Sequence, residues 1–104
     1  MSKITISKLQ AYIKEHDYNP ELKQGYFLKL AEEVGELSRA MRKNSTPASE
    51  AGFKGTVEEE LYDIIYYVLA IANCYGIDVE KWIYIKEKIN DEKYSRERAD
   101  SLLK

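Results

Sequence analysis

Cysteine, histidine and long apolar runs are scarce in this sequence. The single cysteine, Cys74, can form no internal disulfide, and the single histidine, His16, leaves too few ligands for a zinc site. One histidine also excludes a di-iron bundle, which needs Glu-x-x-His pairs on its inner helices. The longest strongly apolar run, residues 64–72, is far too short to span a bilayer. Nothing at the N-terminus resembles a secretory signal, so we expect a cytoplasmic protein.

A strong charge imbalance is also absent, because the formal net charge is only -2. Without a positive field, the chain is not expected to bind nucleic acid or an anionic membrane surface. A length of 104 residues suffices for one hydrophobic core but not for two, so we expect residues 1–104 to form a single domain. A hydrophobic fraction of 44% and a charged fraction of 33% are typical of a helix-rich globular chain.

Helix signals divide the chain, and no stretch alternates with period two for long, so we predict an all-α fold. Side chains suited to N-caps precede the predicted helices: Ser7 (with Gln10 in capping-box spacing), Asn19 (before Pro20), Thr56 (with Glu59), Asp78 and Ser95. The predicted helices cover about residues 7–16, 20–43, 57–75 and 79–92, with a short fifth helix at 96–103. Residues 44–55 are predicted to form the one long loop.

The third predicted helix carries apolar or aromatic residues on most of its circumference ("LYDIIYYVLAIANCY", 61–75). One neighbouring helix cannot cover such a surface, and three modest helices of the same chain would struggle to do so. We therefore predict a four-helix bundle that assembles as a homodimer or homotetramer, in which this helix meets its symmetry mate.

Acidic residues recur at helical spacing in the second and third predicted helices. At about 100° per residue, Glu33 and Glu36 flank one apolar stripe, and Glu60 and Asp63 flank the other in the same rotational sense. If the helices pack antiparallel, stripe against stripe, these four carboxylates meet at one rim. No lysine or arginine is interleaved there, and Mg²⁺ suits such a group of oxygen ligands. Each pair alone is more typical of a solvated helix face, and it is the matched geometry of the two pairs that favours a metal site.

Residues 32–36 ("EEVGE") and 60–63 ("ELYD") together resemble the EExxE…ExxD signature of MazG-like nucleotide pyrophosphohydrolases, in the all-α NTP pyrophosphatase superfamily. Downstream, Lys86, Asn90, Lys93 and Tyr94 resemble the K-x3-N-x2-[KR]-Y segment of that family. The resemblance extends over roughly residues 7–95. It implies Mg²⁺-dependent hydrolysis of a nucleoside triphosphate to the monophosphate and pyrophosphate, with Mn²⁺ able to replace Mg²⁺.

The resemblance also implies a role for each matched residue. Four residues would be metal ligands: Glu33, Glu36, Glu60 and Asp63. Glu32 would be the base or the residue that orients the attacking water. The phosphates would be bound by Lys86, Asn90, Lys93 and Tyr94, although lysines at a helix C-terminus are also explained by the helix dipole. Candidates for the base are His16, Tyr18 and Asn73, the last being equally suited to a structural hydrogen bond.

The substrate and the function class stay open at this point. A deoxy- or non-standard nucleotide, removed in a house-cleaning role, is one interpretation, and phosphoribosyl-ATP would keep the same chemistry with another substrate. A different class is a non-catalytic helical module whose acidic rim binds a basic partner. Stabilisation by Mg²⁺ or Mn²⁺ would favour the enzyme, whereas simple salt screening would favour the module.

Overall fold

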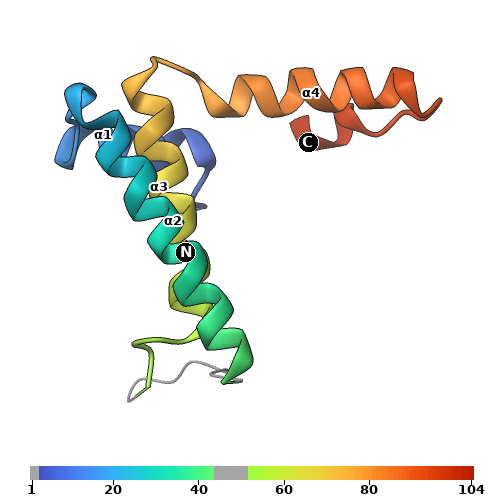
Figure 1. Ribbon diagram of the computed structural model, residues 1–104. Coiled ribbons are helices and arrows are strands. Elements are labelled where there is room, and N and C mark those ends of the chain that lie inside the picture. Colours follow the sequence, from blue (N-terminus) through green and yellow to red (C-terminus); the bar gives the residue numbers. More distant parts are fainter. Residues whose placement is uncertain (1–2, 44–51) are drawn as a thin grey trace.

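The computed structural model describes residues 3–43 and 52–104, which contain four α-helices and two short 3-10 helices (Figure 1). The α-helices are α1 (Ile6–His16), α2 (Lys23–Arg42), α3 (Val57–Cys74) and α4 (Val79–Lys93), and the 3-10 helices are η1 (Pro20–Leu22) and η2 (Ala99–Leu103). No strand occurs among these described residues, so the predicted all-α class is confirmed. Most of the predicted loop, residues 44–51, lies outside them.

Side-chain caps account for the starts of three α-helices. Thr56 Oγ1 accepts a hydrogen bond from the Glu59 backbone N–H at 3.2 Å, as predicted. Asp78 Oδ1 accepts from the Lys81 N–H at 3.2 Å, also as predicted. The predicted cap of α1 was wrong, because Thr5 Oγ1 accepts from Lys8 N–H at 3.1 Å and the helix begins before Ser7.

Two other predicted caps have different roles. Asn19 makes no side-chain cap bond, and its amide donates to Asp17 and to the hydroxyl of Tyr26 instead. Ser95 adopts a left-handed conformation (φ 51°) that ends α4 rather than starting a helix. The following N–H, that of Arg96, donates back to the Asp91 carbonyl at 2.9 Å, which is the Schellman arrangement. The last helical turn therefore begins only at residue 99.

The core lies where α1 packs on the antiparallel pair formed by α2 and α3. Ile13 of α1, Tyr26 of α2, and Leu69 and Ala70 of α3 are buried together. The partly buried Tyr66 and Tyr67 pack against this group, as do several aliphatic side chains. Aromatic residues at the α2–α3 contact therefore form one edge of the core.

The apolar stripes from which the α2–α3 packing was predicted are partly exposed. Three residues of the α2 stripe remain more than half exposed: Phe27, Val34 and Met41. Three residues of the α3 stripe remain more than two-fifths exposed: Leu61, Ile65 and Val68. Stripe-to-stripe packing was therefore wrong, and the two helices meet through neighbouring sides. Despite this apolar surface, none of the described helices has the length and hydropathy to cross a membrane.

Helix α4 projects away from the other three helices and packs on η2 and on α1 (Figure 1). Buried Gln10 and Asn73 fix the point where it leaves. Gln10 Nε2 donates to Asn73 Oδ1 at 3.1 Å and to the Ile77 carbonyl, and Asn73 Nδ2 donates to the Gln10 carbonyl at 3.0 Å. The Val79 N–H donates to Gln10 Oε1 at 3.3 Å. Asn73 thus makes the structural hydrogen bond that was one of its two predicted roles.

Candidate active site

Three of the predicted metal ligands come together between α2 and α3. Glu33, Glu60 and Asp63 each offer a carboxylate oxygen, and these atoms lie within 4.8 Å of one another. Glu60 is only 5% exposed, and its Oε2 has no hydrogen-bond partner among the described residues. A buried polar atom without a partner is costly, which makes this position unusual in a folded chain.

Burial and repulsion disfavour negative charge at this cluster. Burial is the main cause that raises the pKa of Glu60 to about 7, followed by a hydrogen bond shared with Glu33 and by the charges of Glu33, Asp63 and Glu59. The pKa of Asp63 is also raised, first by burial and then by the charges of Glu33 and Glu59, while Lys54 opposes the shift. A hard divalent cation with oxygen ligands fits this cluster, because it would supply both the missing charge and a partner for Glu60 Oε2.

The other two predicted acidic residues lie outside the cluster. Glu36 is one turn further along α2, with its side chain half exposed and Oε1 3.9 Å from Arg39 NH1. The Glu32 side chain is 65% exposed, and its Oε2 is 3.4 Å from Lys29 Nζ. Surface ion pairs of this kind contribute little, so both side chains are able to rotate. The metal-binding role of Glu36 and the catalytic role of Glu32 stay predictions.

A cavity of about 400 Å³ adjoins the carboxylates and has mainly aromatic walls. It is lined by Tyr12, Ile13, His16, Asp17, Glu33, Tyr62, Asp63, Tyr66 and Tyr67. His16, a predicted base-binding residue, belongs to this lining, with its ring centroid 4.6 Å from that of Tyr12. Tyr18 does not belong to it, and its ring faces Lys14 Nζ at 5.2 Å.

Sequence reasoning did not single out the tyrosines of α3 or the carboxylate of Asp17. A signal for the tyrosines was present, because Tyr62 and Tyr66 are one turn apart on α3 and bracket Asp63. Asp17 gives no comparable signal, because it follows the end of α1 and its partners are distant in sequence.

The residues predicted to bind phosphates are far from this cluster in the same chain. Lys86, Asn90, Lys93 and Tyr94 belong to α4 and its C-cap. Glu60 is near the N-terminal end of α3, about 20 Å of helix from the turn into α4. Helix α4 then points away from α2 and α3 (Figure 1). The structure therefore does not bring these residues to the carboxylates of their own chain.

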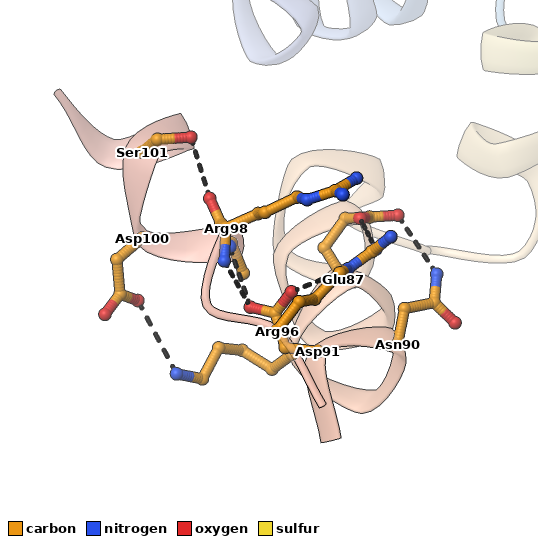
Figure 2. Close-up of polar contacts among 9 residues, drawn as sticks. Glu87, Asn90, Asp91, Arg96, Arg98, Asp100 and Ser101 are labelled. Atoms are coloured by element: carbon orange, nitrogen blue, oxygen red, sulfur yellow. Dashed lines mark hydrogen bonds and ion pairs between the residues drawn. The ribbon is translucent and has the colours of Figure 1, made fainter. Parts of the chain in front are cut away.

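Asn90 is held within a polar network at the end of α4 (Figure 2). Its Nδ2 donates to Glu87 Oε2 at 3.1 Å, and the other oxygen of Glu87 accepts from Arg96 NH2 at 2.9 Å. Arg96 Nε donates to Asp91 Oδ1 at 3.0 Å, while Asp91 Oδ2 accepts from the backbone N–H groups of Arg98 and Ala99. This network fastens η2 to α4.

Comparison with known proteins decides the family. Residues 23–96 match the sequence model of the MazG nucleotide pyrophosphohydrolase domain, and both acidic segments and the α4 segment lie inside that match. The chain belongs to the MazG family. A MazG-family protein is a hydrolase that releases pyrophosphate from a nucleotide and generally depends on a metal ion, in agreement with the acidic cluster.

Relatives of this MazG-family chain cover most of its length. The Bacillus subtilis (strain 168) protein described as uncharacterized protein YpjD is 32% identical, over 78% of each chain. The crystal structure of C-terminally tagged iMazG from Vibrio DAT 722 is 48% identical, covers 85% of this chain and 99% of its own, and gives a TM-score of 0.81. The N-terminally tagged form is 49% identical, covers 89% and 100%, and gives 0.85.

Proposed function

We propose that this MazG-family protein is a cytoplasmic Mg²⁺-dependent enzyme that hydrolyses a nucleoside triphosphate to the monophosphate and pyrophosphate. The observation that carries the proposal is the buried Glu60 carboxylate, one oxygen of which has no partner within residues 3–43 and 52–104, in a cluster beside a cavity of about 400 Å³. A deoxy- or non-standard nucleotide is the proposed substrate, in a house-cleaning role. Mn²⁺ would be able to replace Mg²⁺ because both accept carboxylate and water oxygens.

Glu33, Glu60 and Asp63 would hold the metal ions, and Glu36 would join them. Glu36 lies one turn from Glu33 on α2, and its half-exposed side chain can turn away from Arg39. When bound, divalent cations would neutralise phosphate charge and supply a water of lowered pKa. Glu60 must give up any proton that it holds before it can serve as a ligand, so metal binding should weaken as the pH falls.

Glu32 is the proposed residue for orienting the attacking water. It neighbours Glu33 on α2 but points into solvent, so it can approach a water from outside the cluster without being a ligand. Its ion pair with Lys29 would break when substrate arrives, at little cost for an exposed pair. A carboxylate in this place would accept the proton of the water during in-line attack on the α-phosphorus.

The aromatic cavity is the proposed site for the nucleoside part of the substrate. His16 and the surrounding tyrosines offer flat apolar faces, against which a base can stack. The same cavity includes Glu33 and Asp63, so a nucleoside bound in it would place its phosphates near the carboxylates.

The proposed phosphate-binding residues of α4 would act at the site of a second copy. In its own chain α4 points away from the acidic cluster, and the exposed apolar residues of α2 and α3 leave a surface for a symmetry mate. A homodimer or homotetramer would cover this surface and bring Lys86 and Asn90 of one chain to the carboxylates of another. A shared site explains why a single chain keeps the two groups apart.

A panel of ribo- and deoxyribonucleoside triphosphates, together with phosphoribosyl-ATP and oxidised nucleotides, would test the proposal with pyrophosphate release as the readout. We expect Mg²⁺-dependent release from at least one of them and no release by the Glu60→Ala variant. Equal release in excess chelator, or none from any nucleotide by the wild-type protein, would refute it. The control is Glu92→Gln, an exposed change on α4 that leaves the cluster intact.

A further inference from the structure

Asp17 ties three elements together at the wall of the aromatic cavity. It follows the last residue of α1, and its carboxylate accepts hydrogen bonds from side chains of α2 and α3. Tyr66 of α3 donates to Oδ2 at 2.6 Å, and Tyr26 of α2 donates to Oδ1 at 2.7 Å. Asn19 Nδ2 adds a weaker bond to Oδ1 at 3.3 Å. One carboxylate therefore fixes the end of α1 against α2 and α3.

The bonds to Asp17 are the strong kind, in which a hydroxyl donates to an ionised oxygen. They hold the pKa of Asp17 below its usual range, with Tyr66 the largest cause and Tyr26 the next, although burial acts in the opposite direction. Burial, followed by the same contact with Asp17, raises the pKa of Tyr66, so its hydroxyl keeps its proton. Asp17 is thus a permanent acceptor at any pH where the protein is expected to work.

The position of these bonds relates them to the acidic cluster. Tyr66 lies one turn after Asp63 on α3, and Tyr26 lies about two turns before Glu33 on α2. Asp17 itself lines the cavity, next to His16. The carboxylate therefore sets the distance between the aromatic residues of α1 and the helices that carry the metal-binding carboxylates.

Resting on the function proposed above, we propose that Asp17 is a positioning residue for the nucleoside part of the substrate. Through Tyr66 and Tyr26 it holds the end of α1 so that His16 and Tyr12 form one wall of the cavity. It does not touch the triphosphate and has no part in metal binding. Loss of Asp17 should therefore weaken binding of the nucleoside part and leave binding of the phosphate chain unchanged.

A comparison of two ligands separates these parts of the site. The first is the best substrate of the nucleotide panel, measured by KM and kcat, and the second is inorganic tripolyphosphate, measured as an inhibitor. For Asp17→Ala we expect KM to rise about tenfold, the equivalent of about 1.4 kcal/mol of binding free energy. The inhibition constant of tripolyphosphate and the Mg²⁺ dependence should stay within about twofold of wild type, a change of less than about 0.5 kcal/mol.

Conservative variants keep the test meaningful if Asp17→Ala folds poorly. Tyr66→Phe removes only the donor hydroxyl, and Asp17→Asn keeps the shape but can no longer accept from both tyrosines as an anion. Both should raise KM for the nucleotide by smaller factors in the same direction. Thr5→Ala is the matched control, because it removes the cap at the opposite end of α1 and lowers stability without touching the cavity.

The outcomes of this experiment are distinct. An active protein whose Asp17 and Tyr66 variants keep the wild-type KM would overturn the positioning role while leaving the proposed function intact. An inhibition constant for tripolyphosphate that rises as much as KM would also overturn it, because the defect would then lie in the whole site. If the wild-type protein releases no pyrophosphate from any nucleotide, the proposed function itself is refuted, and the positioning role is refuted together with it.

Discussion

Replacement of Glu60 by glutamine should make the metal-free protein more stable. The folded protein raises the pKa of Glu60 from 4.5 to about 7, chiefly by burial. Each pKa unit corresponds to about 1.4 kcal/mol, so the ionised carboxylate costs the fold about 3 kcal/mol at pH 8. Glutamine has nearly the same shape and carries no charge, and its amide can donate to Glu33. The Glu60→Gln variant should recover most of that free energy.

The sign of the pH dependence follows from the same shift. Between pH 4.5 and about 7 the folded protein keeps a proton on Glu60 that the unfolded chain has released. The stability contributed by this group therefore falls as the pH rises through that range, and the full penalty applies above it. The metal-free wild-type protein should lose stability from pH 5 to pH 8 through Glu60, and Glu60→Gln should lack this part of the slope.

Calorimetric unfolding in chelator and in saturating Mg²⁺ would measure both effects. At pH 8 in chelator, we expect Tm of Glu60→Gln to exceed that of wild type by about 10 °C or more, given about 4–8 °C per kcal/mol for a domain of this size. Mg²⁺ should raise Tm of the wild type and leave the variant nearly unchanged, because only the wild type binds the ion tightly. Glu92→Gln removes an exposed charge and should behave as wild type.

Two results would refute this account of Glu60. The first is a metal-free Glu60→Gln variant that is no more stable than wild type at pH 8, which would mean that Glu60 is not under electrostatic strain. The second is equal stabilisation of both proteins by Mg²⁺, which would place the ion elsewhere.

Three further predictions concern the role of Glu32, the sharing of a site between two chains, and the role of Asp91. Glu32→Gln should lower kcat severely and leave calorimetric Mg²⁺ binding nearly unchanged, and a wild-type kcat would remove Glu32 from the mechanism. Lys86→Ala and Glu33→Gln should each be inactive, yet an equimolar mixture of the two after reassembly should recover about a quarter of wild-type activity if two chains share each site of a dimer. No recovery in an oligomer shown to exchange subunits would contradict a shared site. Hydrogen bonds from Ala99, Arg98 and Arg96 hold the pKa of Asp91 below its usual range. The stability that ionised Asp91 gives to the folded protein is therefore present above about pH 4 and is lost as the pH falls further. Asp91→Asn should therefore speed amide hydrogen exchange at residues 98 and 99 at neutral pH, and unchanged exchange would show that Asp91 does not hold η2.

The sequence was sufficient to predict the four helices, because apolar periodicity and caps such as Thr56 and Asp78 are local. It also predicted that Glu33, Glu60 and Asp63 lie close together, although that prediction assumed stripe-to-stripe packing of α2 and α3, which the structure does not show. It failed where a choice depends on contacts between distant segments. The α2–α3 contact is rotated away from the predicted stripes, a result of packing that periodicity within one helix does not contain.

The same limit explains the errors at single residues. Thr5 and Ser7 are both acceptable caps for α1, and only the packed structure selects Thr5. Asn19 does not cap the helix because its amide donates to Asp17 and Tyr26. Ser95 does not cap a helix because it forms the turn after α4, which allows Asp91 to accept from the N–H group of Arg98 at the start of η2. Asn19 shows the physical reason, because one of its partners, the Tyr26 hydroxyl of α2, lies nearby only after folding.

The bonds of Gln10 with Asn73, Ile77 and Val79 have a consequence for where this unit can be cut. The family match begins at residue 23, after α1, but α1 supplies the buried Ile13 and Gln10 and one wall of the cavity. A chain trimmed to the matched region would leave Asn73 without its amide partner and the direction of α4 unset. For this protein the boundary of the family match is therefore not the boundary of the cooperative folding unit, which has to include the first helix.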